Sequence, residues 1–158
     1  MNPRYVELAE TLKRLYTSPP AIQKQIVATS YSPDAVFCDP FVYVHGKSDV
    51  FSQFKSLPSL FRDIQYSYDP NLITSTTVEG GEQVQIQNVQ TYFVGKKEIK
   101  MNCTTQLTVM KDAEDRLLVT RHEDIWEKNY FKYLPLYESF GRKFTGKVTC
   151  FFINLFVK

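Results

Sequence analysis

Apolar residues are spaced with a helical period in the first part of the chain and with a strand period after it. Residues 4–16 place apolar side chains every three or four positions, which predicts an amphipathic helix with an inner stripe of Tyr5, Leu8, Leu12 and Leu15. Pro19 and Pro20 cannot continue this helix. A second helix is predicted over 20–31, with Ile22 and Ile26 on its inner face.

A short strand and a third helix are predicted next. Ser32-Pro33-Asp34 has the composition of a turn, and residues 35–39 alternate as in a strand. A loop then continues through Gly46. Ser48 is a candidate N-cap for a helix over 49–57, which we expect Pro58 to end. The apolar stripe of this helix is Val50, Phe51, Phe54 and Leu57.

Residues 64–126 have the alternation of long strands. Asp69-Pro70-Asn71 interrupts the first strand, over 64–78, and predicts a bulge in it. Turns predicted at 79–82, 95–97 and 111–115 leave further strands over 83–94, 98–111 and 116–126. The clearest alternation places on one face Met101, Cys103, Thr105, Leu107 and Val109.

Consecutive long strands joined by tight turns form a curved meander, and its apolar face must be covered. The preceding helices are the elements that can cover it. The predicted fold class is therefore α+β. We expect a cone-shaped, curved antiparallel sheet with the N-terminal helices packed in its concave face, which is a cystatin-like α+β barrel.

Composition narrows the function only a little. A chain of 158 residues can form one domain with its own core, and a net charge of +2 is too small to indicate nucleic-acid binding. The aromatic share of 15% suits a pocket, an interface or a large core. Cys38, Cys103 and Cys150 lack zinc-site spacing, so we expect free thiols and neither a metal nor a cofactor.

The two ends of the chain give predictions about location. Residues 1–10 lack an apolar signal core, so an intracellular, cytoplasmic location is predicted, with an organelle as the alternative. Residues 129–158 form a separate tail in which basic residues precede the apolar run 148–157. That run is shorter than the roughly 20 residues that a spanning helix needs. The tail is either an extension docked on the domain at 1–128 or an element that contacts a membrane surface.

The pattern resembles the nuclear-transport-factor-2-like superfamily, which includes ketosteroid isomerase-like and polyketide cyclase-like proteins. The resemblance rests on two N-terminal helices, the run 31–40 (YSPDAVFCDP), Gly46 with a Phe-rich helix, and a meander that ends in 121–126 (RHEDIW). It covers roughly residues 4–128 and is greatest to uncharacterised plant, algal and fungal stand-alone members. It implies a conical cavity between the helices and the sheet.

The resemblance places Asp39 where isomerase-like members carry a general base. Such a base needs an apolar setting, which Phe37 can supply. An isomerase also needs a buried acid or phenol to hold an enolate oxygen, and Tyr16 and Tyr92 are the candidates. The alternative for Asp39 is structural, because an Asp before a proline can accept backbone hydrogen bonds and shape the loop.

The last predicted strand presents two possible inner faces. If His122, Asp124 and Trp126 are concave, they meet in the pocket as in dehydratase-like relatives. If they are convex, the residues that face inward are Arg121, Glu123 and Ile125. Asn88 and Gln90 similarly mark either the polar part of the pocket or a bulge. The predicted ligand-binding residues are Phe37, Asp39, Tyr66, Tyr92, Leu107, His122, Asp124 and Trp126.

The predicted function is a non-catalytic domain that holds a small apolar ligand in this pocket. One alternative is an isomerase or dehydratase that uses Asp39 and His122 as catalytic residues. Another is an interaction module that forms a homodimer through the polar, Thr- and Gln-rich face of the sheet. Nucleic acid is not among the expected partners.

Overall fold

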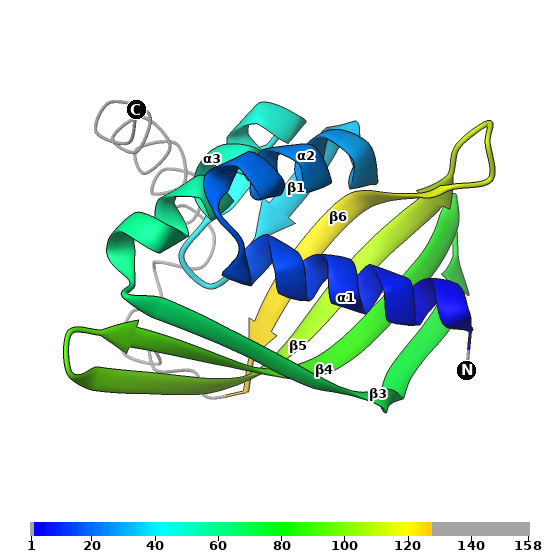
Figure 1. Ribbon diagram of the computed structural model, residues 1–158. Helices are drawn as coiled ribbons and strands as arrows, with labels where there is room; N and C mark the ends of the chain where they lie inside the picture. The colour runs from blue at the N-terminus through cyan, green and yellow to red at the C-terminus, as the bar shows by residue number, and fades with distance from the viewer. Residues whose placement is uncertain (1, 128–158) are drawn as a thin grey trace.

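The computed structural model describes residues 2–127, which form three helices and six strands (Figure 1). The helices are α1 (Pro3–Thr17), α2 (Pro20–Ser30) and α3 (Lys47–Leu60). The strands are β1 (Tyr31–Cys38), β2 (Tyr43–His45), β3 (Asp63–Val78), β4 (Gly81–Val94), β5 (Lys97–Lys111) and β6 (Leu117–Trp126). The predicted tail at 129–158, including Cys150, lies outside the described residues. None of the helices over 2–127 is long and apolar enough to span a membrane.

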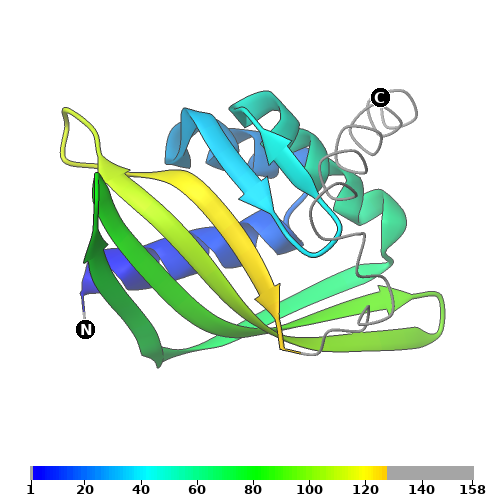
Figure 2. The same cartoon turned by 180° about the vertical axis from the view of Figure 1, so that it is seen from behind.

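The strands form one curved sheet in the order β2-β1-β6-β5-β4-β3. The β3–β4–β5–β6 meander is antiparallel throughout, and β1 joins it parallel to β6 (Figure 2). The helices cover the concave face of the sheet, with α1 lying along the meander (Figure 1). The predicted α+β fold is confirmed. The sheet is mixed and open, because β1 enters parallel to β6 and β2 and β3 remain at its edges.

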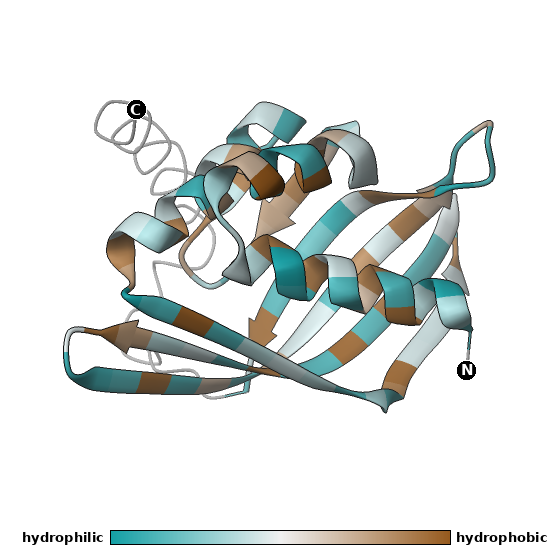
Figure 3. Cartoon of the chain, in the orientation of Figure 1, coloured by the Kyte–Doolittle hydropathy of each residue, from teal (hydrophilic) through white to brown (hydrophobic). Residues whose placement is uncertain are grey.

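The core lies between α1, α2 and the inner face of the meander. Leu12 and Leu15 of α1 and Val84, Ile86 and Leu107 of the sheet are almost completely buried. Figure 3 shows the corresponding alternation of hydrophobic and hydrophilic positions along the long strands. Burying one such side chain stabilises the fold by about 1.5–3 kcal/mol. This core holds the inner faces of β4, β5 and β6 in fixed positions relative to α1.

Four local predictions are wrong, three of them between residues 32 and 48. Ser32-Pro33-Asp34 is not a turn but part of β1, at a register shift against β6 where Pro33 need not donate a ladder hydrogen bond. Part of the predicted loop before Gly46 forms β2, which has only three residues and so shows no readable alternation. Helix α3 begins after Gly46, which has a φ of 92°, and Ser48 is not its N-cap.

Helix α3 also continues past Pro58 to Leu60. Pro58 falls in the last turn, so only one helical hydrogen bond is lost there. The predicted bulge in β3 is confirmed, as a register shift between Tyr68 and Ile73. The residues on either side of that shift pair with one continuous β4, so the interruption bends the strand without dividing it.

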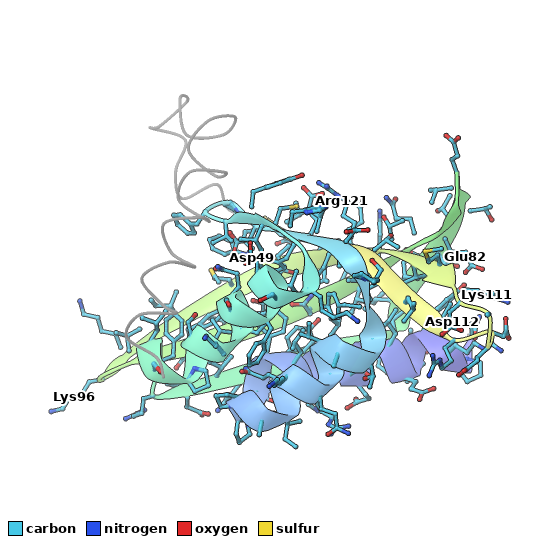
Figure 4. All side chains as sticks on the ribbon, turned by 90° about the horizontal axis from the view of Figure 1, so that it is seen from above. Asp49, Glu82, Lys96, Lys111, Asp112 and Arg121 are labelled. Carbon is cyan, nitrogen blue, oxygen red and sulfur yellow. The ribbon has the colours of Figure 1, made fainter. Side chains whose placement is uncertain are left out.

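Several charged side chains lie at the ends and on the outer face of the sheet. Figure 4 shows Lys96 projecting from one end of the meander, and Lys111 and Asp112 from the other. Arg121 pairs with Glu123 at 2.9 Å on the outer face. Arg121, Glu123 and Ile125 therefore lie on the outer face of β6. His122 and Asp124 are buried and face the helices. The homodimer through the outer face remains a prediction.

Candidate functional site

A cavity of about 530 Å³ lies between α3, the β1–β2 connection and the neighbouring ends of β4, β5 and β6. Small-molecule sites commonly have volumes of roughly 300–1,000 Å³. Most of the wall is apolar, with aromatic rings from Tyr16, Phe37, Phe41, Phe54, Phe61, Tyr92 and Trp126. Asp39 and Asp124 contribute carboxylates to the same wall. The size and lining are those of a site for one small organic molecule.

Asp124 on β6 is the centre of the polar part of this cavity. It is 4% exposed and is the only buried carboxylate within residues 2–127. Tyr16 donates a hydrogen bond to its Oδ2, Gln90 donates to the same oxygen at 3.3 Å, and Thr105 donates to Oδ1 at 2.6 Å. Burial alone raises the pKa of Asp124, but His122 and the hydrogen bonds from Thr105 and Tyr16 outweigh it and lower that pKa. The carboxylate is therefore ionised at neutral pH.

His122 lies behind this carboxylate and is fully buried. Its Nδ1 is 2.8 Å from the Tyr31 hydroxyl, and its Nε2 is 3.5 Å from Asp124 Oδ1. The rings of Phe37 and Phe54 pack on the imidazole, with centroids 5.0 and 5.7 Å away. Both phenylalanines line the cavity, whereas His122 does not. The imidazole therefore supports the wall from behind.

Two phenols complete the polar part of the wall. The Tyr16 ring comes from α1 and stacks on Tyr66 at 5.3 Å, and Tyr92 of β4 donates to Gln90 Oε1 at 2.6 Å. Burial raises the pKa of Tyr16 and Tyr92 well above the ordinary value, and the charge of Asp124 adds to the shift. Both phenols are therefore protonated at neutral pH.

Asp39 follows the end of β1 and shapes the connection to β2. Its Oδ1 accepts hydrogen bonds from the backbone N–H groups of Phe41 and Val42, both at 2.7 Å. This is the structural role weighed for an Asp before a proline. The side chain is half-buried and also lines the cavity, so a ligand can meet it.

The predicted ligand-binding residues fall into two groups. Phe37, Asp39, Tyr92, Asp124 and Trp126 line the cavity. Tyr66, Leu107 and His122 are buried without lining it. Asn88 and Gln90 face inward and are not turned outward by a bulge. Asn88 donates to Thr105 at 2.9 Å.

Two side chains that contact Asp124 and His122, namely Thr105 and Tyr31, were not predicted from the sequence. Thr105 stands directly opposite Asp124 in the β5–β6 register, so a correct strand pairing could have found it. Tyr31 gave no comparable signal, because its contact with His122 joins residues 91 positions apart. Within residues 2–127 there is no cluster of three His, Cys, Asp or Glu side chains that could hold a metal.

Comparisons with known proteins agree on the architecture. The sequence matches no family model and no curated protein. Among solved structures, a protein named Rd1NTF2_04 with long sheet aligns with a TM-score of 0.55 at 11% identity, over 75% of this chain and 97% of that one. The chain has the nuclear-transport-factor-2-like fold. At such an identity the likeness shows the fold alone.

Two further solved structures share this nuclear-transport-factor-2-like fold. One is a candidate isomerase of the SnoaL-like family from Agrobacterium tumefaciens, with a TM-score of 0.57 and 9% identity over 80% of this chain and 100% of that chain. The other is a candidate scytalone dehydratase from Novosphingobium aromaticivorans, with a TM-score of 0.59 and 14% identity over 81% of this chain and 89% of that chain. The fold thus occurs in proteins named for different reactions, so the fold alone does not determine the function of this chain.

Proposed function

We propose that the chain binds a small, mostly apolar molecule in the cavity and does not transform it. The observation that carries the proposal is an aromatic-walled cavity of about 530 Å³ with its polar groups gathered around Asp124. Apolar walls provide affinity by removing ligand surface from water, and a few fixed polar groups orient the ligand.

A cavity-filling substitution tests this proposal. Met101 lines the cavity, while Met110 on the same strand β5 is exposed to 42%. We expect Met101→Trp to weaken binding of the neutral probe N-phenyl-1-naphthylamine at least tenfold, because the indole occupies the space that the ligand needs. Met110→Trp is the matched control and should leave the affinity unchanged. Equal affinities in both variants, followed by the fluorescence of the probe, would contradict the proposal.

The second candidate function is an isomerase or dehydratase. The observation that favours it is the presence of two carboxylates, Asp39 and Asp124, on one cavity with Tyr16 beside them. In the predicted pair of Asp39 and His122, only Asp39 lines the cavity. Asp124 is hydrogen-bonded by three donors and has a lowered pKa, which makes it a weak base near neutral pH. These points favour binding over catalysis.

Proton exchange separates the two candidates. An isomerase must remove a proton next to a carbonyl, so it exchanges that proton with deuterated solvent. We expect the protein to leave the exchange of α-tetralone, followed by proton NMR, at its uncatalysed rate. Acceleration of the exchange by the protein would instead indicate acid–base catalysis. It would be established if Asp39→Asn or Asp124→Asn abolished the acceleration and Asp115→Asn retained it.

A further inference from the structure

The hydroxyl hydrogens of the two cavity phenols are already committed to protein acceptors. Tyr16 donates to Asp124, and Tyr92 donates to Gln90 Oε1 at 2.6 Å. A phenol has one O–H donor, so each oxygen is left with acceptor capacity only. Both residues line the cavity. A ligand that reaches them therefore meets acceptors.

Asp124 adds a further acceptor and a negative charge. Its two oxygens accept three hydrogen bonds from the neutral side chains of Tyr16, Gln90 and Thr105, and His122 interacts with it as well. None of the described residues that line the cavity is Lys, Arg or His. The nearest imidazole nitrogen, Nε2 of His122, is 3.5 Å from Oδ1 and on the buried side of the carboxylate. The wall at Asp124 therefore favours a positively charged group.

The aromatic walls favour the same kind of ligand. A cation within about 6 Å of a ring centroid is attracted by the negative ring face, and the attraction grows when water is excluded. The rings of Tyr16, Phe37 and Phe54 lie near one another, with Phe54 centroids 5.2 and 5.1 Å from the other two. The one buried donor without a partner among residues 2–127 that lines the cavity is the indole N–H of Trp126.

We infer that the ligand of this cavity is an organic ammonium compound, whose charged N–H end meets Asp124, Tyr16 and Tyr92 and whose apolar part contacts the aromatic walls. This inference rests on the proposed binding function and names its ligand class. A ketone, an enolate or a carboxylate presents acceptors, for which the described lining offers one unpartnered buried donor, the indole N–H of Trp126, and an anion is repelled by Asp124. The geometry thus distinguishes among ligands of similar shape by their charge.

Three probes with one phenethyl group test the inference on the unmodified protein. Phenethylammonium carries the charge, propylbenzene has a methyl group in its place, and 3-phenylpropionate carries the opposite charge. Trp126 is the only tryptophan of the chain and lines the cavity, so its fluorescence reports binding of each probe. We expect phenethylammonium to bind at least tenfold more tightly than propylbenzene, and 3-phenylpropionate to bind more weakly than both.

The outcomes separate this inference from the proposed function. Propylbenzene or 3-phenylpropionate binding as tightly as the ammonium would overturn the ammonium inference and leave the binding function in place. No change with any of the three probes or with N-phenyl-1-naphthylamine would overturn both. Asp124→Asn should reduce the preference for the ammonium to less than threefold, and Asp115→Asn should keep it. The comparison of probes on the unmodified protein decides the inference even if Asp124→Asn does not fold.

Discussion

Replacing Asp124 with alanine is expected to lower the free energy of unfolding by about 3 kcal/mol or more. The substitution removes the acceptor of Tyr16, Gln90 and Thr105, all of them buried. Each buried donor left without a partner costs about 1–3 kcal/mol, and the loss of partners in a buried cluster is among the larger effects of a single substitution. Urea unfolding followed by circular dichroism measures the change.

Asp115 provides the matched control for this prediction. It lies in the β5–β6 turn, exposed, and pairs with Arg4 and Lys111 at the surface. Asp115→Asn should change stability little, because exposed ion pairs contribute little and asparagine tolerates the left-handed backbone of this position, where φ is 60°. Losses of equal size for the two variants would show that Asp124 does not organise the buried cluster.

Acid should reveal the same interaction. The pKa of Asp124 is lowered in the folded state, so its ionisation stabilises the fold fully above the unfolded value of about 3.9. That stabilisation is lost as the pH falls below this value and through the folded pKa. The unfolding free energy of the native chain should therefore decrease more steeply in this range than that of Asp124→Asn.

The second large effect is expected at Gly81, the first residue of β4. A Cβ at this position would lie 2.1 Å from the backbone oxygen of Val109, so the end of the β4–β5 ladder must move to admit it. Forcing extra atoms into a packed site costs typically 1–3 kcal/mol, and here the obstacle is backbone. We expect Gly81→Ala to destabilise the fold by about 3 kcal/mol in urea unfolding.

Gly80→Ala is the control, because it introduces backbone strain without a steric contact. Gly80 has a φ of +80°, but nothing lies within 4 Å of an added Cβ. Gly80→Ala should cost only the penalty of a left-handed backbone, about 1–2 kcal/mol. A larger loss for Gly80→Ala than for Gly81→Ala would contradict the close approach of Gly81 to Val109.

The sequence predicted the parts of the fold that local chemistry determines. The bulge in β3 follows from Pro70, which has no N–H to donate to a ladder, and the inner face of β5 follows from strict alternation. The inner face of β6 stayed open because its buried members, His122 and Asp124, are polar. Their burial depends on partners from other elements, such as Tyr16 and Thr105, and no local pattern shows those partners.

The parallel pairing of β1 with β6 has a consequence for the order of folding. The bonds from Tyr31 to His122 and from Tyr16 to Asp124 join residues 91 and 108 positions apart. Contacts of such separation carry a large loop-closure entropy and form slowly. During synthesis, α1, α2 and β1 leave the ribosome long before the strand that completes their packing. During synthesis, the wall of the cavity at Asp124 can therefore be completed only after β6 has left the ribosome.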